Sequence, residues 1–110
     1  QSLQMIHFAF NEYTLSQEAR GILVQNAAWM KAHPGVKVRI EGNCDERGSE
    51  EYNLALGQKR ADAAKKYLVS LGIPADQLME ISYGEERPLD PAHNEAAWAK
   101  NRRDEFHSVK

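Results

Sequence analysis

The residues best suited to chemistry are concentrated in one short segment, 41–53, whose sequence is EGNCDERGSEEYN. This segment holds five acidic residues, one arginine and the only cysteine of the chain. Three kinds of structure fit that composition: a metal or catalytic site built on the carboxylates, a pocket for a charged ligand, or a solvated loop without a ligand. The spacing of the residues and the elements around them bear on the choice.

Catalysis and metal binding are disfavoured by the spacing. Asp45 and Glu46 are adjacent, so on an extended segment their side chains diverge, whereas paired acid and base carboxylates must face each other across a substrate. Cys44 has no histidine in a recognised relation to it, which favours a small, inert side chain. The acids lack the alternating oxygen ligands of a calcium loop, and the chain contains no HExxH or CxxC motif. These patterns predict no metal site.

The elements on either side of the segment position its residues. Alternating apolar and charged residues over 36–41 predict a one-sided strand before the loop. Ser49 is a suitable N-cap for a helix over 50–71, which Gly72 ends. The segment is therefore expected to connect a strand to a helix.

The same helix carries three further candidates. At 100° per residue, Asn53, Leu56 and Arg60 share one narrow face beside the apolar stripe. An arginine in that position needs partners for its guanidinium, and Asp45 precedes the helix closely enough to be one. Two interpretations stay open: a structural ion pair between Asp45 and Arg60, or a pocket in which they bind the ammonium and the carboxylate of an amino-acid head.

The rest of the chain has the periodicity of an α/β protein. Strands are expected over 6–10 and 78–83, a long helix over 15–30, a short helix over 94–101, and a final strand at the sheet edge over 102–109. Helices that alternate with strands indicate helices packed on a sheet.

Composition narrows the class of protein. With 110 residues, of which 42% are hydrophobic and 27% charged, the chain is expected to form one folded domain, 1–110, without a linker. A net charge of −2 gives no electrostatic case for nucleic-acid binding. No apolar run approaches the roughly 20 residues needed to cross a bilayer, and no export signal is visible.

Several blocks resemble the OmpA-like peptidoglycan-binding domains, and among them the peptidoglycan-associated lipoproteins. The longest block is CDERGSEEYNLALGQKRADAAKKYL, with FAFN upstream and ISYGEERP and AAWAKNRR downstream. The resemblance extends in register from about Ile6 to Phe106. The DERG form of the loop and the SYGEE-x-P block point to the lipoproteins rather than to the broader group.

This resemblance implies an α/β fold with a βαβαβ core, a two-layer sandwich in which the helices pack on one mixed sheet. It also implies non-covalent binding of the diaminopimelate residue of peptidoglycan stems, without enzyme activity or cofactors. Asp45 would accept from the ammonium of the ligand, and Arg60 or Arg103 would hold its carboxylate. The ligand-binding residues assigned by the motifs are Phe10, Asn11, Cys44, Asp45, Asn53, Leu56, Arg60 and Arg103.

The resemblance further implies a place in the cell envelope. Members of this family are anchored to the Gram-negative outer membrane by a lipid on an N-terminal cysteine, face the periplasm, and bind the propeller protein TolB within the Tol-Pal system, which acts in cell division. Cys44 is internal, so the chain is expected to be a domain without the signal and anchor segments. The alternatives are a Tol-system interaction module without wall affinity, or the C-terminal domain of an OmpA-type porin or a flagellar stator protein.

Overall fold

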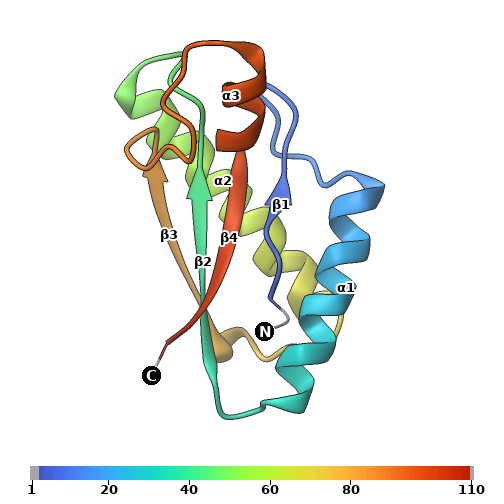
Figure 1. Ribbon diagram of the computed structural model, residues 1–110. Helices are drawn as coiled ribbons and strands as arrows, with labels where there is room; N and C mark the ends of the chain where they lie inside the picture. The colour runs from blue at the N-terminus through green and yellow to red at the C-terminus, as the bar shows by residue number, and fades with distance from the viewer. Residues whose placement is uncertain (1–2, 110) are drawn as a thin grey trace.

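The computed structural model describes residues 3–109 and contains four strands and three α-helices (Figure 1). In chain order the elements are β1 (Ile6–His7), α1 (Gln17–Ala32), β2 (Lys37–Asn43), α2 (Glu50–Ser70), a 3-10 helix (Ala75–Gln77), β3 (Leu78–Gly84), α3 (Glu95–Asn101) and β4 (Arg103–Val109). Residues 1, 2 and 110 of the predicted domain lie outside the described residues.

The strands form one mixed sheet in the order β1-β4-β2-β3. Strands β2 and β3 are parallel, and β4 is antiparallel to both of its neighbours. Figure 1 shows α2 behind the sheet and α1 beside it, with α3 beyond the end of the strands at which β2 stops and β4 begins. The predicted two-layer α/β arrangement with a mixed sheet is confirmed.

The position predicted for the last strand was wrong. Strand β4 lies inside the sheet, where Asp104 pairs with Ile6 of β1 and Phe106 pairs with Ile40 of β2. The edges are β1 and β3. Periodicity identifies which residues of a strand face the core, but it contains no information on which strands are neighbours.

The first strand is shorter than its apolar alternation predicts. Regular pairing covers only Ile6–His7, and the Phe8 N–H donates to the Arg102 carbonyl at 3.0 Å. Beyond it the chain turns, and the Glu12 N–H donates to the Ala9 carbonyl at 3.1 Å. This turn leaves residues 9–12 outside the sheet, where their backbone contacts α2.

A single apolar core joins the sheet to the two long helices. Its members include Ile6, Leu23, Met30, Ile40, Ala64, Leu68 and Phe106, all at most 5% exposed. Within residues 3–109 no helix combines the length and the hydrophobicity that a membrane span requires.

Two glycines set the height of α2 above the sheet. A Cβ atom on Gly42 of β2 would overlap the Gly57 carbonyl oxygen, and a Cβ on Gly57 would overlap the Ser82 hydroxyl. The helix and the strand therefore touch through their backbones, which only glycine allows at this separation. This contact holds the N-terminal half of α2 against the end of β2.

Replacing Gly57 with alanine tests this contact. We expect Gly57→Ala to lower the free energy of unfolding by about 1–3 kcal/mol, because the added methyl group overlaps the Ser82 hydroxyl and crowds the Gly42 carbonyl, and this overlap outweighs the gain in helix propensity. Urea unfolding measures the change. The control is Gly21→Ala in α1, where a Cβ would meet nothing within 4 Å, and where we expect stabilisation of about 0.5–1 kcal/mol. Equal effects at both positions would contradict the account.

Candidate functional site

A pocket of about 220 Å³ lies where the end of β2, the loop before α2, the start of α2 and the turn after β1 meet. Seven of the eight residues selected from the sequence line it: Phe10, Asn11, Cys44, Asp45, Asn53, Leu56 and Arg60. Arg47, Gly48 and Tyr52 complete the lining. Residues far apart in the sequence thus form one concave surface.

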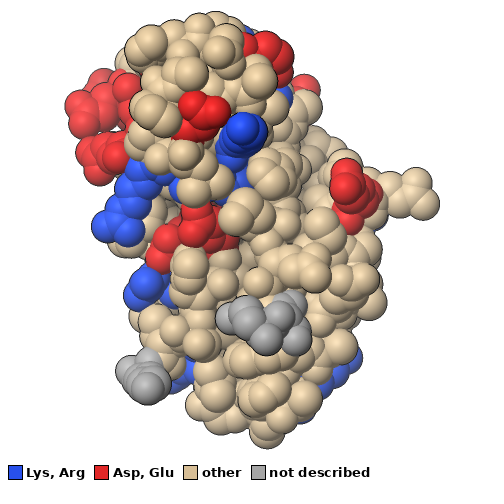
Figure 2. Space-filling view, in the orientation of Figure 1, with Lys and Arg blue, Asp and Glu red and all other residues tan. Residues whose placement is uncertain are grey.

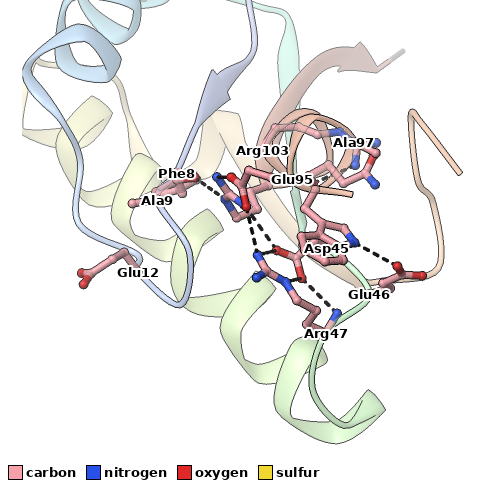
Figure 3. A network of polar contacts seen from close by, with 12 residues as sticks. Phe8, Ala9, Glu12, Asp45, Glu46, Arg47, Glu95, Ala97 and Arg103 are labelled. Carbon is pink, nitrogen blue, oxygen red and sulfur yellow. Dashed lines mark hydrogen bonds and ion pairs between the residues drawn. The ribbon is translucent and has the colours of Figure 1, made fainter. Parts of the chain in front are cut away.

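Asp45 is almost fully buried in this pocket, with its side chain 4% exposed, and it is already paired. The Arg47 side chain donates from Nη2 to Oδ2 at 2.9 Å and from Nε to Oδ1 at 3.3 Å, and the Arg47 backbone N–H donates to Oδ1 at 2.9 Å. Figure 3 shows the two side chains facing each other. Burial opposes ionisation of the carboxyl, but the hydrogen bonds from Arg47 outweigh it and lower the pKa of Asp45 below its usual value.

Arg60 makes no ion pair with Asp45, so the structural ion pair considered from the sequence is not formed. Its guanidinium donates to three backbone carbonyls: Glu12 at 2.7 Å, Asn43 at 3.0 Å and Ala9 at 3.2 Å. Arg60 is 1% exposed, and this burial lowers the pKa of its guanidinium. The arginine joins the turn after β1 to the end of β2, while Arg47, much closer in sequence, pairs with Asp45.

Asn53 and Cys44 hold the wall of the pocket together. The Asn53 amide donates to the Glu85 carboxylate at 2.6 Å and to the Arg47 carbonyl at 3.1 Å, which fixes the loop against the start of α2. The Cys44 thiol donates to the Asn53 carbonyl at 3.2 Å. Burial raises the pKa of Cys44 to about 11, so the group stays a neutral thiol near pH 7. Leu56, 7% exposed, supplies apolar surface.

Phe10 and Asn11 lie at the mouth of the pocket. Phe10 is 51% exposed, and Asn11 adopts a left-handed backbone conformation with φ of 61°. The Tyr52 hydroxyl of α2 donates to the Asn11 side-chain oxygen, which ties the turn to the helix across the pocket mouth.

Arg103 was expected to hold the ligand carboxylate, but this residue does not line the pocket. Its guanidinium pairs with Glu105 at 2.7 Å and donates to the Arg87 carbonyl at 2.8 Å. Arg103 and Glu105 are two apart in β4, so they share a sheet face. The preceding Arg102 does not line the pocket either, but it lies beside a lining residue, with Nη1 3.6 Å from Asp45 Oδ2.

Sequence reasoning missed Arg47 and Trp98 as parts of the site. The Arg47 guanidinium lies 3.9 Å from the centroid of the Phe10 ring and 4.1 Å from that of the Trp98 ring, so it contacts aromatic surface from two elements. The Trp98 indole N–H donates to Glu46 at 2.9 Å. The sequence could have indicated Arg47, because an arginine two residues after an aspartate can pair with it. The contact between Trp98 and Arg47 depends on the tertiary fold, so no local pattern predicts it.

One group of side chains on the open face of the sheet has the composition of a metal site. The ligand atoms of Glu41, Glu105 and His107 lie within 4.8 Å of one another. Each carboxylate is already bonded to an arginine at 2.7 Å, Glu41 to Arg39 and Glu105 to Arg103. Figure 2 shows acidic atoms over the strands with basic atoms on either side. Because the charges are balanced, we interpret this group as an ion-pair network.

The fold belongs to a known class of domain. The model of the OmpA family matches residues 7–102. This match covers most of the chain, and the chain therefore belongs to the OmpA family.

Curated relatives and solved structures define the resemblance further. The chain is 50% identical over 103 residues to the peptidoglycan-associated lipoprotein of Pasteurella multocida, a match that covers 94% of this chain and 69% of the relative. The corresponding Haemophilus influenzae protein is also 50% identical, with 94% and 67% covered. The crystal structure of the peptidoglycan-associated lipoprotein from Burkholderia pseudomallei superposes with a TM-score of 0.92 at 42% identity, over 96% of this chain and 89% of that one. The resemblance predicted from the sequence is confirmed.

A structural likeness to a more distant protein shows the fold alone. The C-terminal domain of Helicobacter pylori MotB superposes with a TM-score of 0.91 at 22% identity, over 98% of this chain and 85% of that one.

Substituting Arg60 with lysine tests its role in building the pocket. We expect Arg60→Lys to lower the free energy of unfolding by about 2 kcal/mol, because a lysine ammonium cannot reach three divergent carbonyls and leaves buried acceptors unpaired. Arg20→Lys is the matched control, since Arg20 also donates to a backbone carbonyl, that of Leu15 at 2.8 Å, but at an exposed position. Urea unfolding measures both variants. If the free energy of unfolding fell by the same small amount in Arg60→Lys and Arg20→Lys, the three hydrogen bonds of Arg60 would not stabilise the fold.

Proposed function

We propose that the chain binds peptidoglycan non-covalently and holds the side-chain head of a diaminopimelate residue in the pocket. The names of its relatives, peptidoglycan-associated lipoproteins, support association with the cell wall. The observation that carries the proposal is that a carboxylate and a guanidinium line one small pocket while both are nearly inaccessible to solvent, Asp45 at 4% and Arg60 at 1% exposure.

The chemistry of these two groups suits an amino-acid head. Asp45 accepts from the ligand ammonium, in a charge-assisted hydrogen bond. The three carbonyl bonds of Arg60 use three of the five N–H groups of a guanidinium. One N–H on each of Nη1 and Nη2 thus has no acceptor among the described residues and is available to the ligand carboxylate. A volume of about 220 Å³ is below the range of pockets that enclose a drug-sized ligand, and it suits a head group rather than a whole disaccharide.

This arrangement also gives selectivity among cell walls. A lysine side chain supplies the ammonium but lacks the neighbouring carboxylate. With a lysine-type stem the two remaining Arg60 donors stay unpaired in a desolvated site, which costs affinity. The pocket therefore favours stems that contain diaminopimelate.

Wall binding assigns the chain a mechanical role in the Gram-negative envelope. The domain lies at the periplasmic face of the outer membrane, where an N-terminal lipid anchor makes it a tether between membrane and wall. TolB is the protein partner, on a surface that overlaps the pocket, so wall and TolB compete. Binding of this kind makes and breaks no covalent bond, and the pocket acts as a receptor without catalysis.

Calorimetric titration with a diaminopimelate-containing stem tripeptide tests the proposal. We expect Asp45→Asn to weaken binding by about tenfold or more, because a charge-assisted hydrogen bond becomes a neutral one. Asp45 suits this test better than Arg60, whose loss disturbs the fold itself. Glu51→Gln, an exposed acid in the first turn of α2, should leave the affinity unchanged.

The ligand supplies a second control. The lysine-type tripeptide should bind the unmodified protein more weakly than the diaminopimelate peptide. Equal affinities for the two peptides, or an unchanged affinity in a folded Asp45→Asn variant, would show that the pocket does not recognise the charged groups of the side-chain head.

A further inference from the structure

We propose that Arg47 occupies, in the ligand-free protein, the subsite that receives the ligand ammonium, so that binding exchanges one cation for another. This inference rests on the proposed function and adds to it a residue that competes with the ligand from within the chain.

The acceptor atoms for the two cations are the same. Arg47 reaches both carboxylate oxygens of Asp45, through Nη2 at 2.9 Å from Oδ2 and Nε at 3.3 Å from Oδ1. Because the Asp45 side chain is only 4% exposed and Arg102 Nη1 already lies 3.6 Å from Oδ2, no open face of the carboxylate is left for a cation from solvent. A ligand ammonium can reach Asp45 only after the Arg47 side chain has moved away.

The surroundings of the Arg47 guanidinium form a general cation site. The rings of Phe10 and Trp98 lie 3.9 Å and 4.1 Å from it, and the Asp45 carboxylate provides the negative charge. Aromatic faces and a carboxylate attract an ammonium as well as a guanidinium, because both cations are drawn to the negative face of a ring and to the carboxylate charge. The subsite is therefore suited to the ligand as well as to Arg47.

Arg47 is also the arginine of this site that can leave. Its side chain is 31% exposed, and the Glu95 carboxylate, 69% exposed and 3.9 Å from Nη2, offers a partner outside the pocket. Arg60 and Arg102 are instead buried and bonded to backbone carbonyls. The backbone N–H of Arg47 still donates to Asp45 at 2.9 Å, so the side chain can move while the loop keeps its shape.

The negative charge of Asp45 keeps a positive neighbour during the exchange. Arg102 Nη1 lies 3.6 Å from Asp45 Oδ2, and this arginine is fixed by the Phe8 carbonyl at 2.8 Å and by Glu95 at 3.2 Å. The carboxylate therefore keeps one positive neighbour whether Arg47, the ligand ammonium or neither occupies the subsite. In a variant without the charge at position 47, Arg102 still lies beside the Asp45 carboxylate and the backbone N–H of residue 47 can still donate to it.

The test measures stem-peptide affinity by calorimetry in the full chain and in Arg47→Gln. We expect Arg47→Gln to bind the diaminopimelate tripeptide about five- to tenfold more tightly, because the ammonium no longer displaces an ion pair. A second peptide has hydrogen in place of the side-chain amino group and keeps the carboxylate. It should show no gain, since it has no ammonium to compete. Arg87→Gln is the control variant: Arg87 stacks on Tyr83 at 3.6 Å, away from the pocket, and its loss should leave both affinities unchanged.

The outcomes separate this inference from the proposed function. Weaker binding of both peptides by Arg47→Gln would show that Arg47 itself holds the ligand, and an unchanged affinity would show that no exchange takes place. Either result overturns this inference alone, provided that the unmodified protein binds the diaminopimelate peptide. If the unmodified protein and Arg47→Gln both fail to bind it, the proposed function fails, and this inference fails with it.

Discussion

The site depends on one buried guanidinium that connects three separate segments. Arg60 extends from α2 to the carbonyls of Ala9 and Glu12, in the turn after β1, and of Asn43, at the end of β2. The close contact of Gly57 with the sheet brings α2 near enough for these bonds to form. Because buried carbonyls need donors, the arginine determines the position of the turn. The pocket is the space enclosed by these segments.

The carboxylate of this pocket is paired before any ligand arrives. Asp45 is paired with Arg47 and lies near Arg102, and Asn53 ties the loop to Glu85. Such internal pairing explains how a nearly inaccessible carboxylate remains ionised. It also means that the affinity for a ligand is a difference between two sets of contacts, one within the protein and one with the ligand. A pocket of this kind discriminates by offering the correct pair of charges.

Most of the helices and strands, and one wall of the pocket, could be predicted from short-range patterns, whereas Phe10, Asn11 and Cys44 were assigned through the family resemblance. The rotation of 100° per residue in an α-helix places Asn53, Leu56 and Arg60 on one face. All three line the pocket. The differences from what the sequence suggested concern contacts that depend on the tertiary structure. Arg60 has backbone carbonyls as partners rather than Asp45. In the NRR block, Arg102 lies beside Asp45, whereas Arg103 pairs with Glu105. The order of the strands likewise had no signal in the periodicity.

The most direct test of the account is a crystal structure of the chain with a diaminopimelate-containing stem tripeptide. The account predicts the side-chain head inside the pocket, with its ammonium nitrogen about 3 Å from the Asp45 carboxylate and its carboxylate on Arg60. It also predicts the Arg47 side chain displaced from Asp45. A peptide bound elsewhere, with the Asp45–Arg47 pair intact, would contradict the account.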